Sequence, residues 1–99
     1  MSTDEGTPPR QVIGRTIVVN NQRGLHARAA ARFVRTAALF DARVTVGKGG
    51  QAVSGGSILG LMMLAAGPGS EIEISAEGDQ AQAAIDALCQ LVEANFEEC

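Results

Sequence analysis

Apolar and polar residues alternate along short segments of this chain. Between residues 71 and 76 the alternation is strict, which predicts a strand with one buried and one exposed face. Residues 43–47 alternate in the same way, and the β-branched residues within 12–19 predict a further strand. Residues 48–50 predict a hairpin turn, after which residues 51–54 return as a short strand at an edge of the sheet.

Apolar residues at helical spacing predict three helices. The first spans 27–40, the second is a short apolar helix over 58–65 that starts with Ser57 as its N-cap, and the third follows Asp79. We expect Asp79 to cap the third helix, with Gln82 as its capping-box partner. The core-facing residues of the first helix are Ala30, Phe33, Val34, Ala37 and Phe40. Those of the third are Ala81, Ala84, Ile85, Leu88, Val92 and Phe96.

The order of these elements, β-α-β-β-α-β-α, predicts an α+β fold. A sheet with one helix-free face is an open-faced β-sandwich, here a four-stranded antiparallel sheet covered on one face by three helices. Residues 1–11 contain two adjacent prolines and no periodicity, so we expect a flexible N-terminal tail. Residues 12–99 then form one domain, an ordinary size for a chain of 99 residues.

Charge is distributed unevenly along the sequence. The net charge is −3, yet all eight basic residues lie between Arg10 and Lys48, and eight of the eleven acids follow Gly49. Such a division favours an acidic partner or an anionic ligand on one face, although solvated charge without a role is the alternative. The overall acidity and the absence of Trp and Tyr speak against a nucleic-acid partner.

The composition also limits location and cofactors. The longest apolar run, 58–67, is too short to span a bilayer, and no charged-then-apolar signal opens the chain, so we expect a cytoplasmic protein outside the membrane. One histidine and the two cysteines Cys89 and Cys99 do not supply the ligands of a zinc site. Within one intact helix the two cysteines would lie too far apart for a disulfide. We therefore expect no metal and no cofactor.

His26 is the single histidine, and it lies directly before the alanine-rich helix. No Ser, Thr, Asp or Asn occupies the capping position, so the first N–H groups of that helix lack the usual side-chain acceptor. Such a helix start binds anions, and Arg28 in the first turn can add a charge-assisted hydrogen bond to a phosphate. This makes His26 a candidate phosphate acceptor and Arg28 its clamp. The alternative is a surface histidine that only caps or packs.

The second helix offers a different candidate region. Ser57 is a structural N-cap that would also tolerate a phosphate, because a helix start favours negative charge. Leu59 and Met62, if exposed, would form an adaptable docking patch; the alternative is that both are core residues. On the first helix, Arg32 and Arg35 form a basic stripe with Arg28.

Two motifs carry a resemblance to a known family. The run GLHAR at 24–28 is followed by SILGLMMLAA at 57–66, and over residues 13–97 the chain resembles HPr, the histidine phosphocarrier of the bacterial phosphotransferase system. The resemblance implies that enzyme I, charged by phosphoenolpyruvate, phosphorylates His26 on Nδ1, and that an enzyme IIA receives the group. It also implies that HPr kinase/phosphorylase modifies Ser57. Relatives usually have Pro after the Arg, where this chain has Ala29.

The resemblance further implies a monomeric, stoichiometric carrier that is not an independent enzyme. Its partners would dock on Arg32, Arg35, Leu59 and Met62. The alternative function is a regulatory protein-binding module that uses the same surface without phosphoryl transfer.

Overall fold

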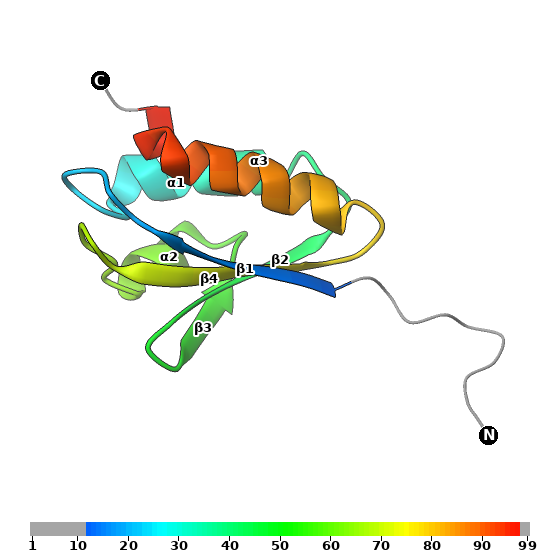
Figure 1. The fold of residues 1–99 in the computed structure, drawn as a ribbon, viewed down its shortest axis with the longest axis horizontal. Coiled ribbons are helices and arrows are strands. Elements are labelled where there is room, and N and C mark those ends of the chain that lie inside the picture. Colours follow the sequence, from blue (N-terminus) through cyan, green and yellow to red (C-terminus); the bar gives the residue numbers. More distant parts are fainter. Residues whose placement is uncertain (1–11, 98–99) are drawn as a thin grey trace, which may run out of the picture.

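A computed structural model describes residues 12–97 as an antiparallel sheet with helices on one of its faces (Figure 1). The strands are β1 (Val12–Val18), β2 (Arg43–Lys48), β3 (Gln51–Ser54) and β4 (Glu71–Glu77). The helices are α1 (Ala27–Ala37), α2 (Ile58–Met63) and α3 (Ala81–Glu93), followed by a 3₁₀ turn, η1 (Asn95–Glu97). The predicted open-faced sandwich, with its order of strands and helices, is confirmed.

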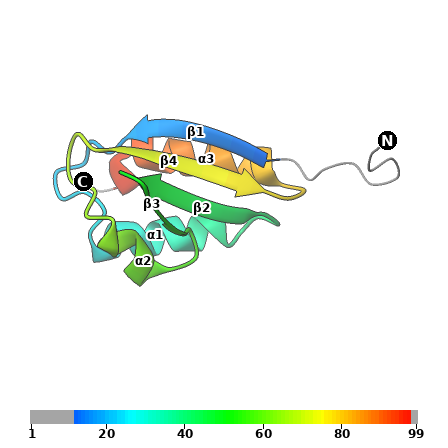
Figure 2. The same ribbon diagram turned by 90° about the horizontal axis from the view of Figure 1, so that it is seen from below.

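The four strands lie side by side in the order β1-β4-β2-β3, so β1 and β3 form the two edges (Figure 2). All neighbouring pairs are antiparallel, and Ile74 at the centre of β4 is the partner of both Arg15 on β1 and Val46 on β2. The predicted edge position of 51–54 is therefore confirmed. Gly49 and Gly50 both have positive φ, at 56° and 85°, which is the backbone that a two-residue hairpin turn requires.

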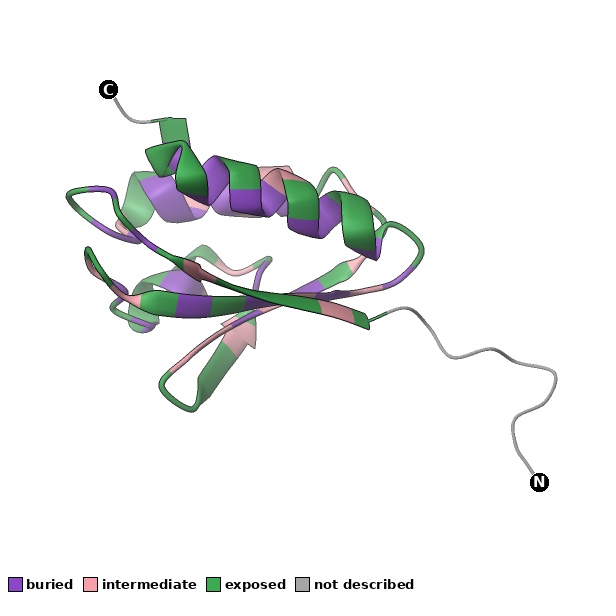
Figure 3. Ribbon diagram, in the orientation of Figure 1, coloured by how far each residue is buried: buried purple, intermediate pink, exposed green. Residues whose placement is uncertain are grey.

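The core lies between the helices and the covered face of the sheet (Figure 3). Ile72 and Ile74 point into it from β4, while Glu71 and Glu73 on the same strand are exposed, as the alternating pattern predicts. Phe33 on α1 and Leu88 on α3 are completely buried above them. A side chain of this kind contributes about 1.5–3 kcal/mol when it leaves water, so these residues hold the helices against the sheet.

The predicted cap of the third helix is wrong. Gln80, not Asp79, is the N-cap of α3, and no side chain accepts a hydrogen bond from the first turn of this helix. The Gln80 side chain instead accepts a hydrogen bond from the backbone N–H of Asp41, at 2.6 Å. Gln82 donates to Asp86 rather than completing a capping box. The start of α3 is therefore tied to the turn between α1 and β2, which local sequence does not reveal.

All three helices are shorter than predicted. The helix α3 ends at Glu93, and Phe96, predicted on its buried stripe, is buried from the 3₁₀ turn η1 instead. The helix α1 ends at Ala37, and Phe40 packs against the core from the following turn. The helix α2 ends at Met63, and Ala65 takes a left-handed conformation with φ of 53°. The apolar spacing continues past these ends because the next residues are also needed in the core.

The two charged halves of the sequence meet in space. Arg15 on β1 lies 3.8 Å from Asp86 on α3, and Arg32 on α1 lies 2.9 Å from Glu97. Part of the basic half is thus paired with the acidic half, and the division along the chain is not a simple division between two faces.

Candidate functional site

The loop between β1 and α1 is a turn closed by an asparagine. The Asn21 side chain donates a hydrogen bond to the Gly24 carbonyl at 2.8 Å, and the Gly24 N–H donates to the Asn21 carbonyl at 3.1 Å. Asn21 is 2% exposed, the one buried polar residue of the described chain, and Leu25 anchors the end of the turn in the core. The turn therefore has little freedom to move the next residue, His26.

Gly24 is required here for two reasons. Its φ is +64°, a conformation that glycine adopts without a steric penalty. A Cβ at this position would also collide with the carbonyl oxygen of Ala66 and lie 2.8 Å from Cα of Gly67. The same Ala66 carbonyl accepts a hydrogen bond from the Leu25 N–H at 2.9 Å. The chain after α2 thus holds the start of α1 in place.

His26 is the N-cap residue of α1. Its backbone is extended, with φ of −76° and ψ of 179°, and its carbonyl accepts the first helical hydrogen bond, from the Ala30 N–H at 2.9 Å. No side chain caps this helix start. The N–H groups of Ala27, Arg28 and Ala29 precede that first helical bond, so they have no partner within the helix. Three donors and the positive end of the helix dipole therefore lie beside the half-buried imidazole.

A surface hollow of about 490 Å³ opens at this helix start. It is lined by Asn20, Asn21, Gln22, Arg23, His26, Arg28, Arg32, Asn95 and Glu97. Three of these residues are arginines and one is an acid, so the hollow is suited to an anion. The structure brings His26, Arg28 and Arg32 together here, whereas Arg35 lies outside this hollow.

Ser57 is the N-cap of α2, as predicted. Its Oγ accepts a hydrogen bond from the Gly60 N–H at 2.9 Å, and its backbone is extended. The helix that follows divides into a buried side, with Leu61 completely inaccessible, and an exposed side. Leu59 is 68% exposed and Met62 is 40% exposed, so the interpretation of every apolar residue here as core is wrong. Ile58 and Met63 extend this exposed apolar patch.

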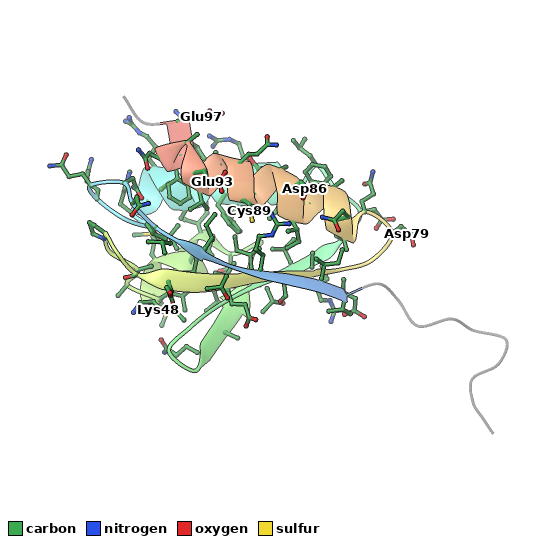
Figure 4. The ribbon with its side chains drawn as sticks, in the orientation of Figure 1. Lys48, Asp79, Asp86, Cys89, Glu93 and Glu97 are labelled. Carbon is green, nitrogen blue, oxygen red and sulfur yellow. The ribbon has the colours of Figure 1, made fainter. Side chains whose placement is uncertain are left out.

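Two elements of the site are absent from the predictions made from sequence. Asn21 was expected only as part of a loop, although Asn at the first position of a turn and Gly at the fourth are a known turn pattern. Glu97 and Asn95 reach the hollow from the other end of the chain, and no local pattern indicates that. Figure 4 shows Glu97 at the end of the segment that follows α3, far from Asp79 at the other end of this helix.

Burial raises the pKa of the Cys89 thiol above its ordinary value of 9.0, while Arg15 opposes the shift. Cys89 is a buried free thiol on α3; Cys99 lies outside the described residues, so the predicted lack of a disulfide stays a prediction.

Within 12–97, no helix has the length and apolar character needed to cross a membrane. In the same range, no cluster of three or more His, Cys, Asp or Glu residues could hold a metal ion.

Together, the open-faced sandwich and the uncapped helix start define a small α+β domain that can hold an anion beside a histidine. Residues 13–94 match the model of the PTS HPr component phosphorylation site. The chain belongs to the HPr family of phosphocarrier proteins.

Individual relatives agree with this assignment. The chain is 44% identical to the phosphocarrier protein NPr of Shewanella violacea, over 85% of this chain and 92% of that protein. It is 45% identical to the phosphocarrier protein HPr of Pseudomonas putida, over 85% and 94% of the two chains. The crystal structure of HPr-C-His from Thermoanaerobacter tengcongensis superimposes with a TM-score of 0.84 at 42% identity, covering 88% of this chain and 98% of that one.

Proposed function

We propose that this chain carries a phosphoryl group on His26, which it receives from enzyme I and passes to an enzyme IIA. The supporting observation is the position of the only histidine at an uncapped helix start beside Arg28. Free N–H groups and a guanidinium stabilise the charge of a phosphoryl group during transfer. A half-buried ring at the rim of an open hollow also remains accessible to a second protein.

The transfer is a substitution at phosphorus. One ring nitrogen of neutral His26 attacks phosphorus with its lone pair, and a new N–P bond forms. The bond between phosphorus and the donor breaks, and the donor keeps that electron pair. The proton on the other ring nitrogen stays in place, so the reverse sequence delivers the group to the acceptor.

We propose that Ser57 is a regulatory phosphorylation site for an HPr kinase/phosphorylase. The phosphate would lie beside the exposed apolar patch of α2. Two negative charges there must lose water when a partner covers Leu59 and Met62, which weakens docking. The phosphate would also replace the hydroxyl that now accepts a hydrogen bond from the Gly60 N–H.

We propose that enzyme I and an enzyme IIA dock on the apolar patch of α2 and on the arginines of α1. Leu59 and Met62 supply adaptable apolar contacts, and Arg35 is exposed for charge pairing. Arg32 is partly covered, since its side chain is 32% exposed and paired with Glu97. Docking of this kind uses one monomer and places the partner over His26.

The second candidate function is a regulatory binding module that docks on the same patch without phosphoryl transfer. The exposed apolar side of α2 favours it, because a binding module needs such a surface and no reactive histidine. A tight complex that His26→Ala leaves unchanged, in a protein that accepts no phosphate, would select this function.

The test is incubation with enzyme I and phosphoenolpyruvate, followed by the intact mass. We expect the gain of one acid-labile phosphoryl group, and no gain in His26→Ala. Because the chain has one histidine, the mass alone assigns the position. A His26→Ala protein that still gains acid-labile phosphate would contradict the proposal.

A further inference from the structure

An ion pair joins the first helix to the last turn of the described chain. Arg32 Nη1 donates a hydrogen bond to Glu97 Oε1 at 2.9 Å, across 65 positions of sequence. Both residues line the hollow that contains His26. The Glu97 carboxylate is thus already paired with one of the three arginines that make this hollow suited to an anion.

Arg32 is directed toward the start of α1 by helix geometry. It lies one turn after Arg28 on the same face of the helix, and long helical side chains lean toward the N-terminus. Glu97 does not satisfy the whole guanidinium, since Arg32 Nε is buried without a hydrogen-bond partner in the described structure. A guanidinium has five N–H donors and this side chain is 32% exposed, so donors other than the buried Nε–H are left for a second anion.

Glu97 is placed by a left-handed turn. Asn95, Phe96 and Glu97 have φ of 55°, 57° and 64°, a conformation that L residues rarely adopt in succession. The Phe96 side chain is completely buried and anchors the turn, and the Glu97 N–H donates to the Ala94 carbonyl at 2.9 Å. In Figure 1 this turn (red) lies beside the start of α1 (cyan).

We propose that Arg32 is a second phosphate-positioning residue and that Glu97 competes with the phosphoryl group for it. This inference rests on the proposed function of His26. A phosphoryl group carries a charge near −2 and attracts Arg32 more strongly than a single carboxylate does. It also repels Glu97, so phosphorylation moves the guanidinium from the carboxylate to the phosphate. Glu97 thereby lowers the stability of the phosphorylated form, and the carrier surrenders its phosphoryl group more readily.

The test measures how the phosphoryl group divides between variant and wild type. Isotope-labelled phosphorylated wild type is mixed with an unphosphorylated variant and a catalytic amount of enzyme I, which exchanges the group until equilibrium. Intact masses then give the phosphorylated fraction of each protein. Because this is an equilibrium, slower docking of a variant changes only the time needed.

We expect Glu97→Gln to hold about two- to fivefold more of the phosphoryl group than wild type, the range of a partly exposed ion pair. Arg32→Gln should hold less by a similar factor, and Arg32→Lys should recover part of it. Adding Glu97→Gln to Arg32→Gln should have a smaller effect than Glu97→Gln has alone, since only the repulsion between Glu97 and the phosphoryl group is then removed. If Arg32 and Glu97 had a merely structural role, the effect of one substitution would not depend on the other in this way. The melting temperature of each variant reports any loss of folding.

Glu93→Gln is the matched control for charge, because Glu93 is exposed and lies one turn earlier, outside the hollow. Arg43→Gln is the control for the arginine, since Arg43 lies beyond the other end of α1. If Glu97→Gln divides the group as Glu93→Gln does, the proposal is wrong. If wild type accepts no phosphoryl group from enzyme I, the proposed function fails, and this inference fails with it.

Discussion

The helices α1 and α2 differ in whether a side chain caps their first N–H groups. Each helix begins with N–H groups that have no partner within the helix. At α2 the Ser57 hydroxyl accepts a hydrogen bond from the Gly60 N–H, so the chain satisfies its own donor. At α1 the N-cap is His26, and no side chain caps the helix.

The residues around the two helix starts also differ. Three arginines line the hollow at the α1 start, whereas α2 carries the exposed apolar residues Leu59, Met62 and Met63. A helix start that is satisfied internally supports a surface for another protein. A start that is left open, beside positive charge, keeps its donors for a ligand. The following predictions change one start at a time.

The largest effect is expected from Gly24→Ala. The new Cβ meets the Ala66 carbonyl in a backbone with φ of +64°, so we expect a loss of about 3 kcal/mol in the free energy of unfolding. Phosphate acceptance should fall as well, because the α1 start must move. Gly49→Ala is the matched control: its φ is +56°, but a Cβ there meets nothing within 4 Å, so it should lose only about 1 kcal/mol. Urea titrations in which the two variants lose the same stability would disprove the close contact.

Ser57→Ala tests the capped start. Loss of the hydrogen bond from the Gly60 N–H should cost about 1 kcal/mol of unfolding free energy, measured by urea titration. Ser57→Asp keeps a capping oxygen and adds negative charge, so it should stay nearly as stable as wild type. The same variant should bind enzyme I more weakly, which separates the cap from the charge. Equal stability of Ser57→Ala and wild type would show that the cap contributes nothing.

His26→Asn closes the open start. The backbone at this position is already extended, and an asparagine side chain can accept from the first-turn N–H groups. We expect it to exceed His26→Ala in unfolding free energy by roughly 0.5–1 kcal/mol, while neither variant accepts phosphate. A stability no higher than that of His26→Ala would mean that the donors at α1 are not available.

The smallest effect is expected at Cys89, which lies on α3 and not at the start of α1 or α2. Because burial raises its pKa above 9.0, the folded state favours the neutral thiol. Its contribution to stability is complete below pH 9.0 and is lost as the pH rises toward the folded-state pKa. We expect the unfolding free energy to decline in this alkaline range, and Cys89→Ala to reduce the decline. An identical pH profile for both proteins would contradict the assignment.

Sequence patterns were sufficient wherever one segment decides its own structure. The strict alternation at 71–76, the glycine turn at 49–50 and the helical spacing after Ala27 each describe local geometry with one buried face. The same is true of the capping by Ser57 and the lack of a capping side chain at α1, because both depend on neighbours within three or four residues. These local rules established the fold, His26 as the candidate acceptor and Arg28 as its neighbour.

Tertiary structure alone decided the features in which distant segments meet. Gly24 is required because the chain after α2 passes beside it. At the start of α3, Gln80 is the N-cap in place of Asp79, and its side chain accepts a hydrogen bond from the Asp41 N–H. The ion pair of Arg32 with Glu97 joins the two ends of the domain. Local sequence specifies which residues can donate, accept or carry charge. The partner that each one finds is set by how the helices and strands pack over the common core.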